Sequence, residues 1–198
     1  SVGYPLTKAD WQAKKKQGKR TAIIHFDAHT DLLIERLGID LCFGSWCTHI
    51  LDDLPAPEHL IQVGIRSTGK SKEHWESTFG VKQHWANEIK ELGVKKVINN
   101  ILAQLSSQNI DELYVSFDID AIDESFASST GTPEPDGLMP EEAMQILQAI
   151  AAKYPITGGD MMEIAPFTDS SGKGEESRIK TLKVAGDISA FLIGEISK

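Results

Sequence analysis

Three residues with metal-binding side chains, Asp27, His29 and Asp31, occupy alternate positions early in the sequence. Alternate side chains of an extended segment point the same way, so this D-x-H-x-D pattern brings two carboxylates and an imidazole together. A second acidic group further along the chain contains Asp118 and Asp120. Carboxylates gathered in this way repel one another, and divalent cations relieve the repulsion. The residue types and spacing therefore predict a metal site.

Each acidic group directly follows a stretch with the composition of a buried strand. Thr21–Phe26 and residues 112–117 are short, largely apolar runs. Open α/β folds place their functional residues at the carboxyl ends of parallel strands. We therefore expect both acidic groups to meet at the carboxyl edge of one parallel sheet.

The rest of the chain alternates between strand-like and helix-like patterns. Further strands are expected at 60–66, 81–85 and 156–165, and helices at 6–17, 46–51, 71–78, 86–92, 94–105, 140–153 and 177–197. Residues 34–45, 123–137 and 166–176 are expected to be loops. Strands that alternate with helices predict an α/β fold, with a parallel sheet covered on both faces.

The composition is that of one globular domain. The 198 residues are 40% hydrophobic, and 29 acidic against 20 basic side chains give a net charge of -9, which argues against nucleic acid as a partner. No apolar run has the length of a membrane span, and the N-terminus lacks a signal-peptide pattern, so a cytoplasmic protein is expected. Cys42 and Cys47 lack zinc-type spacing and are interpreted as reduced thiols.

The proposed ligands are too many for one tetrahedral zinc ion and are mostly oxygen donors, which favours Mn²⁺ or a similarly hard divalent ion. Two cations that share bridging carboxylates would keep all the acids ionised, and a metal pair makes water reactive at neutral pH. The implied chemistry is hydrolysis. The alternative for either motif alone is helix capping, turn chemistry and a satisfied histidine.

The chain resembles the ureohydrolases, the family that contains arginase, agmatinase, guanidinobutyrase and formimidoylglutamase. The matching segments are HFDAHTD at 25–31, VGIR at 63–66, SFDIDAID at 116–123, GTPE at 131–134 with Gly137 and Leu138 beyond, and DMME at 160–163 leading to Pro166. The resemblance implies a three-layer α/β/α fold with a mainly parallel sheet, in a single catalytic domain over residues 1–198. The chain opens at Ser1 without the family's Gly-Gly-Asp-His-Ser segment, so we expect the N-terminal part of this fold, and one histidine ligand, to be lacking.

The resemblance further implies two Mn²⁺ ions per chain. Asp27 and Asp118 would bridge them, Asp31 would complete the shell of one ion, and His29 and Asp120 would complete the other. Hydroxide between the ions would attack the central carbon of a linear guanidine or amidine. The products would be an amine and urea, or formamide from an imino substrate.

The substrate-binding residues also come from the resemblance. Glu163 would accept hydrogen bonds from the guanidinium or amidine group, and Thr132 would support that glutamate. The family's proton-shuttling histidine is replaced by Phe43, which leaves His49 as the candidate for this role or as an ordinary histidine of a helix surface or core. Leu33 stands where arginases have an asparagine, which disfavours arginine as the substrate.

The leading hypothesis is therefore an agmatinase-like or guanidinobutyrase-like hydrolase that acts on a small cationic guanidine or amidine and forms a trimer or hexamer. The alternatives are formimidoylglutamase or arginase activity, a non-catalytic member that binds metal or ligand, and the related zinc deacetylases, whose tyrosine and paired histidines we do not find. Asp123 is expected to cap its loop, His25 to be a satisfied core histidine, and Glu163 has the alternative of pairing with Arg66 or a lysine.

Overall fold

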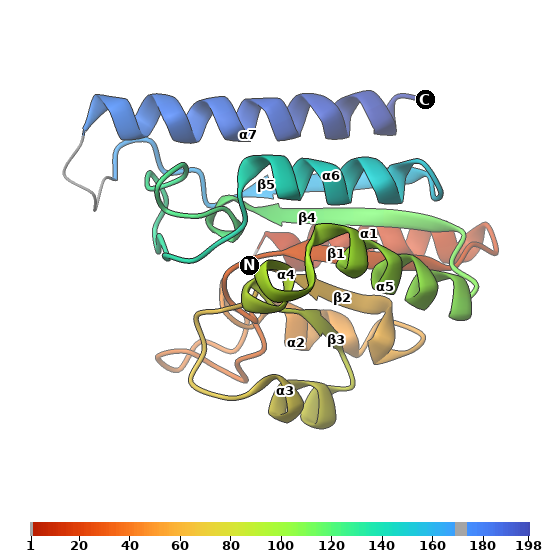
Figure 1. Ribbon diagram of the computed structural model, residues 1–198. Coiled ribbons are helices and arrows are strands. Elements are labelled where there is room, and N and C mark those ends of the chain that lie inside the picture. The colour runs from red at the N-terminus through yellow and green to blue at the C-terminus, as the bar shows by residue number, and fades with distance from the viewer. Residues whose placement is uncertain (1, 169–173) are drawn as a thin grey trace.

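The computed structural model describes residues 2–168 and 174–198, which form a parallel sheet between layers of helices (Figure 1). The strands are β1 (Thr21–Phe26), β2 (Leu60–Val63), β3 (Lys82–His84), β4 (Glu112–Asp118) and β5 (Ile156–Met162). Their spatial order is β3-β2-β1-β4-β5, and every neighbouring pair is parallel. All five carboxyl ends therefore lie at one edge, and the predicted α/β fold is confirmed.

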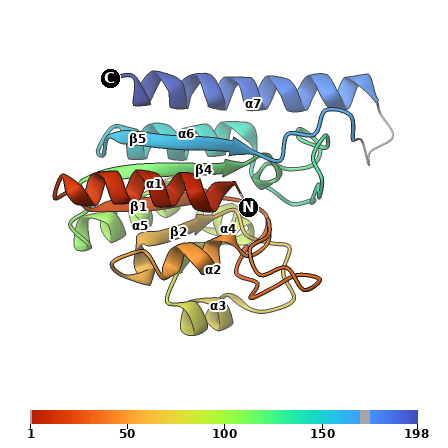
Figure 2. The same ribbon diagram turned by 180° about the vertical axis from the view of Figure 1, so that it is seen from behind.

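Helices cover both faces of the sheet. They are α1 (Gly3–Lys16), α2 (Trp46–Leu51), α3 (Lys72–Phe79), α4 (Ala86–Leu92), α5 (Val94–Ser107), α6 (Pro140–Ala151) and α7 (Glu175–Ile196), with 3-10 turns η1 (Pro57–His59) and η2 (Ile119–Ala121). Helices α5 and α6 lie in front of the sheet in Figure 1, whereas α1 and α2 lie in front in Figure 2. Helix α7 packs against β5 and α6 at the sheet edge. Among the described residues, no helix combines the length and the apolar character that crossing a membrane requires.

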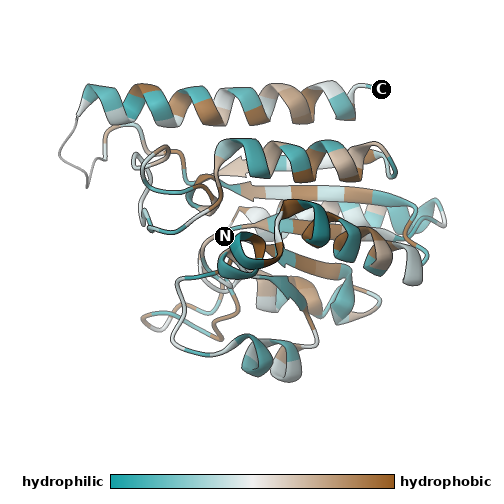
Figure 3. Cartoon of the chain, viewed as in Figure 1, coloured by the Kyte–Doolittle hydropathy of each residue, from teal (hydrophilic) through white to brown (hydrophobic). Residues whose placement is uncertain are grey.

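The residues of β1 alternate between two hydrophobic cores, because successive side chains of a strand point to opposite faces. Ala22, Ile24 and Phe26 pack in the core beneath α5 and α6. Ile23 packs in the second core, with residues of α1 and α2. Hydrophobic residues accordingly follow the strands and the covering helices in Figure 3. His25 comes two residues after Ile23 in β1, so its side chain points to the same face of the sheet. From there it contacts Asp27.

Several element ends differ from the sequence expectation. Strand β2 ends at Val63, because Gly64 has φ 99°, and β5 ends at Met162, because Glu163 has φ 59°. Helix α1 starts three residues early and includes Pro5, which is tolerated because first-turn N–H groups have no intrahelical acceptor. The loop expected at 166–176 falls partly on residues 169–173, outside the described chain, and α7 begins at Glu175.

Candidate metal centre

The five predicted metal ligands line one cavity of about 690 Å³ at the carboxyl edge of the sheet. Strands β1 and β4 are neighbours, with Phe26 opposite Phe117, so Asp27 and Asp118 leave the sheet side by side. Residues more than 90 positions apart are thereby joined: Asp120 accepts a hydrogen bond from the backbone N–H of Ala28 at 3.1 Å, across a separation of 92 residues. The expected convergence of the two acidic groups is present.

Four of the five predicted ligands, together with His25, form two adjoining groups that share Asp27, whereas Asp118 lines the same cavity but belongs to neither group. Nδ1 of His29 lies 3.3 Å from Oδ1 of Asp27 and 3.1 Å from Oδ2 of Asp120. These three residues form one group, and His25, Asp27 and Asp31 form the other; within each group the potential ligand atoms all lie within 4.8 Å of one another. A carboxylate common to two adjacent groups is the arrangement that a bridged pair of ions requires.

Burial of the carboxylates and their mutual repulsion favour the binding of a cation. Burial raises the pKa of Asp31, Asp118 and Asp120, and the negative charge of Asp27 raises each of them further. Burial acts in the same direction on Asp27, but the adjacent histidines outweigh it and lower the pKa of that carboxyl. Divalent cations would remove the repulsion that disfavours ionisation of the other three.

His29 lies where two carboxylates, Asp27 and Asp120, stabilise a positive charge. Burial lowers the pKa of this imidazole, but the hydrogen bonds to Asp120 and Asp27 outweigh it and raise the pKa to about 11. Metal binding must displace this proton, since only the neutral imidazole is a ligand. Aspartate oxygens with one such imidazole fit Mn²⁺ and similar ions by donor type. The residues present therefore suit the metal that the sequence predicts.

Thr132 has a different partner from the one expected. Its hydroxyl donates to Oδ2 of Asp120 at 3.1 Å, and no hydrogen bond between Thr132 and Glu163 occurs in the described part of the chain. The backbone N–H of Asp120 in turn donates to Oδ1 of Asp118 at 3.0 Å. Thr132 thus orients a carboxylate of the acidic cluster in this structure.

Glu163 lines the same cavity. It forms no ion pair or hydrogen bond within the described residues, and Gly131 leaves room for it, because a Cβ there would lie 3.2 Å from Oε2. The alternative pairing with Arg66 is wrong, since that guanidinium donates to backbone carbonyls, including those of Asp120 and Glu134 at 2.8 Å. Glu163 is one of five non-glycine residues with positive φ in the described chain, a conformation often retained at functional sites.

His49 does not line this cavity, as judged from the described residues. It lies on α2, with Nε2 3.1 Å from the carbonyl oxygen of Asp40 and its ring beside that of Tyr4. Phe43, at the position of the missing family histidine, does line the cavity. A proton-shuttle role for His49 would require the loop before α2 to rearrange, and it stays a prediction.

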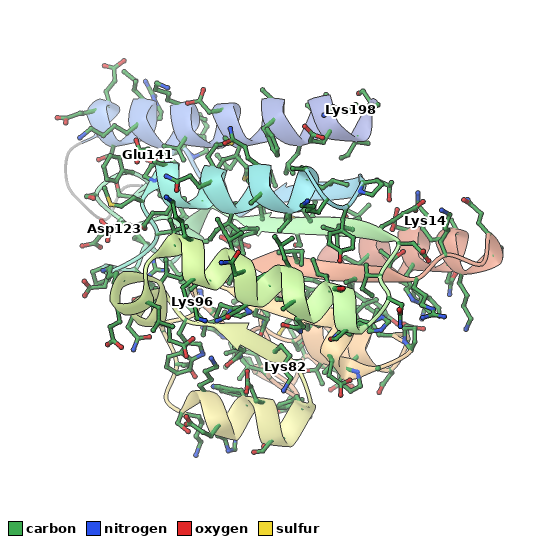
Figure 4. All side chains as sticks on the ribbon, turned by 45° about the vertical axis from the view of Figure 1, so that its right-hand side comes forward. Lys14, Lys82, Lys96, Asp123, Glu141 and Lys198 are labelled. Atoms are coloured by element: carbon green, nitrogen blue, oxygen red, sulfur yellow. The ribbon has the colours of Figure 1, made fainter. Side chains whose placement is uncertain are left out.

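Asp123 caps its loop as expected. Oδ1 accepts from the backbone N–H of Ser125 and Oδ2 from that of Gly137, each at 3.0 Å. Figure 4 shows Asp123 beyond the carboxyl end of β4.

Two cationic side chains in the cavity wall were not anticipated. Arg36 and Lys70 both line the cavity, and neither forms an ion pair with any described residue. The guanidinium of Arg36 lies 4.7 Å from the ring centre of Phe43, which fixes it against the wall. Nothing in the local sequence marks either residue, because each comes from a loop whose path depends on the folded chain.

Comparison with known proteins agrees with this geometry. A sequence profile of the Arginase family matches residues 1–189. The chain is 33% identical over 172 residues to proclavaminate amidinohydrolase of Streptomyces clavuligerus and 31% identical over 175 residues to the mitochondrial guanidino acid hydrolase of Homo sapiens. These alignments cover 85% and 87% of this chain but 54% and 47% of those proteins. The solved structure of the Streptomyces enzyme matches with a TM-score of 0.77 at 30% identity, over 98% of this chain and 62% of that one. The chain thus spans about half the length of the curated relatives it matches.

Proposed function

Because the chain belongs to the arginase family, we propose that it forms the catalytic centre of a hydrolase that cleaves a C–N bond of a linear guanidine or amidine with two Mn²⁺ ions. The observation that carries the proposal is the convergence of five metal-type ligands from β1 and β4 in one cavity. The ureohydrolase relatives support the same class of reaction.

The proposal assigns each ligand a place. Asp27 and Asp118 would contact both ions, Asp31 would hold one, and His29 with Asp120 would hold the other. When bound, such a metal pair lowers the pKa of water and supplies hydroxide at neutral pH. The chain's own task is to orient the carboxylates, and the hydrogen bonds that Asp27 accepts from His25 and that Asp120 accepts from Ala28 and Thr132 support this role.

Glu163 is the proposed substrate-binding residue. A carboxylate accepts two parallel N–H bonds from a planar guanidinium or amidinium group, and these charge-assisted bonds set the orientation as well as the affinity. Because Glu163 and the metal ligands line one cavity, a cation held by Glu163 would present its central carbon to the acidic cluster. Fixing that geometry is itself a large contribution to rate.

The test is the metal content of the protein that carries this chain, together with urea release from a panel of guanidines. We expect about two Mn²⁺ per chain and turnover of an amine-ended or acid-ended guanidine in preference to arginine. Asp118→Ala should abolish both metal and turnover, whereas Asp187→Ala, at an exposed position of α7 and paired with Lys183, should change neither. Metal binding without turnover of any guanidine or amidine would favour the non-catalytic alternative, and absence of both would refute the proposal.

A further inference from the structure

A row of polar side chains crosses the whole sheet beneath the metal centre. Gln83, Gln62, His25, Ser116 and Asp160, one from each strand, lie opposite one another in the register of the sheet. The first four are at most 2% exposed. Buried polar groups are costly unless each donor meets an acceptor, so the direction of every hydrogen bond in this row matters.

The direction is set at the β3 end of the row. The indole N–H of Trp85 donates to Oε1 of Gln83 at 2.8 Å, and an indole nitrogen can only donate. The amide nitrogen of Gln83 must then donate to Oε1 of Gln62, at 2.8 Å. The amide nitrogen of Gln62 in turn donates to Nδ1 of His25, at 3.0 Å. His25 therefore carries its proton on Nε2, which donates to Oδ2 of Asp27 at 2.9 Å.

The remaining polar groups reinforce this assignment. The second N–H of the Gln62 amide donates to the carbonyl of Thr30 at 2.7 Å, inside the D-x-H-x-D segment, so both of its hydrogens are used. At the other end of the row, Asp160 accepts from Ser116 at 2.8 Å and from Tyr114 at 2.7 Å. Those donors satisfy Asp160, and the N–H of His25 is left for Asp27.

We propose that Trp85, Gln83 and Gln62 are positioning residues for the metal centre. Their directed chain supplies the donor to Nδ1 of His25 and, together with the Asp27 carboxylate, fixes the tautomer of this imidazole. His25 holds Oδ2 of Asp27, which leaves Oδ1 on the side of His29. The part of this inference that concerns metal rests on the proposed function. Groups that hydrogen-bond to a metal ligand without contacting the metal typically contribute ten- to hundredfold to metal affinity. These hydrogen bonds run across three strands, from β3 through β2 to β1. They begin at Trp85, which does not line the cavity of the proposed metal site.

The test uses two variants and two measurements. Gln62→Met removes the donor to His25 at similar volume, and Trp85→Phe removes the indole N–H that sets the direction, together with part of the ring, at a partly exposed position. Titration calorimetry would measure Mn²⁺ affinity, and ¹⁵N NMR of the histidine rings in metal-free protein would show which nitrogen of His25 carries the proton. Gln108→Met is the matched control, because this glutamine donates only to a backbone carbonyl, that of Glu58.

We expect the proton of His25 on Nε2 in the parent protein and a mixture of tautomers in both variants. Mn²⁺ affinity should fall about tenfold or more in Gln62→Met and by a smaller factor in Trp85→Phe, with no change in the control. A proton on Nδ1 in the parent protein, or unchanged tautomer and affinity in both variants, would overturn the inference. A parent protein that binds no Mn²⁺ would refute the proposed function instead, and the NMR measurement would still decide the hydrogen-bond direction.

Discussion

Oε1 of Glu134 lies 3.4 Å from Nε2 of His29, on the edge of the imidazole opposite the acidic cluster. Ser67 donates to the same oxygen at 2.8 Å and holds the carboxylate in place. A metal-binding histidine usually donates its second N–H to a carboxylate or carbonyl, which fixes the ring and makes the ligating nitrogen more basic. The Glu134 carboxylate is therefore placed to direct Nδ1 of His29 toward the acidic cluster, the proposed metal site.

The first prediction concerns this pair. Glu134→Ala should weaken Mn²⁺ binding about tenfold or more, because His29 loses the acceptor that orients it. Titration calorimetry at constant pH measures the change. Glu91→Ala, at an exposed position of α4, removes the same charge far from the ring and should have no effect. Equal affinities in the two variants would show that Glu134 does not act through His29.

The second prediction concerns the unpaired cations of the cavity wall. Arg36→Ala and Lys70→Ala should each raise KM for a guanidine with a terminal carboxylate, by about tenfold for an exposed charge-assisted contact. Turnover of an amine-ended guanidine of the same length should be unchanged or improved, since removal of a positive charge relieves repulsion. Steady-state kinetics on the two substrates give the comparison. Equal changes in KM for both substrates would mean that these side chains do not contact the terminal group of the substrate.

The third prediction concerns the packing of the loop that carries Thr132 and Glu134. A Cβ on Gly137 would lie 2.5 Å from the backbone nitrogen of Asp123 and 2.6 Å from Nη2 of Arg66, which is itself held by carbonyls. Gly137→Ala should therefore destabilise the protein by about 2 kcal/mol. Urea unfolding at pH 7 measures the loss.

A matched control lies in α7. A Cβ on Gly186 meets nothing within 4 Å, so Gly186→Ala should stabilise the protein by about 0.5–1 kcal/mol through helix propensity. Equal effects of the two substitutions would contradict the predicted clash at Gly137.

The fourth prediction concerns pH. Burial, with the charge of Lys72, lowers the pKa of His84 from 6.5 to about 4. The folded state thus favours neutral His84. The contribution of His84 to stability is complete well above pH 6.5, where this side chain is neutral in both the folded and the unfolded state. As the pH falls from 6.5 toward 4 the unfolded chain binds a proton first, and stability drops by about 3 kcal/mol at most.

The measurement is urea unfolding at pH 7 and pH 5 in the presence of EDTA. His84→Gln should lose less stability over this interval than the parent protein does. His74→Gln, at an exposed position of α3, should follow the parent protein. If His84→Gln lost as much unfolding free energy between pH 7 and pH 5 as the parent protein, groups other than His84 would cause the acid sensitivity.

Local patterns in the sequence determined most of the secondary structure. Thr21–Phe26, Trp46–Leu51 and Ala86–Leu92 have the expected bounds, because composition and turn residues act over short distances. The expected ends of β2 and β5 were too late, because the positive φ values of Gly64 and Glu163 reflect the path of the folded chain.

The same distinction applies to the site. The spacing of Asp27, His29 and Asp31 is a local property, and from it the sequence predicted a metal site. The segment is not extended as expected, because β1 ends at Phe26, the chain bends at residues 28–29 and Asp31 has φ 51°. The period of a strand also put His25 on the side of Asp27, but it does not say which strand lies next to it. The order β3-β2-β1-β4-β5, set by long-range packing, placed Gln62 beside His25. Only the tertiary structure could therefore decide what orients the ligands, since those contacts join residues distant in the chain.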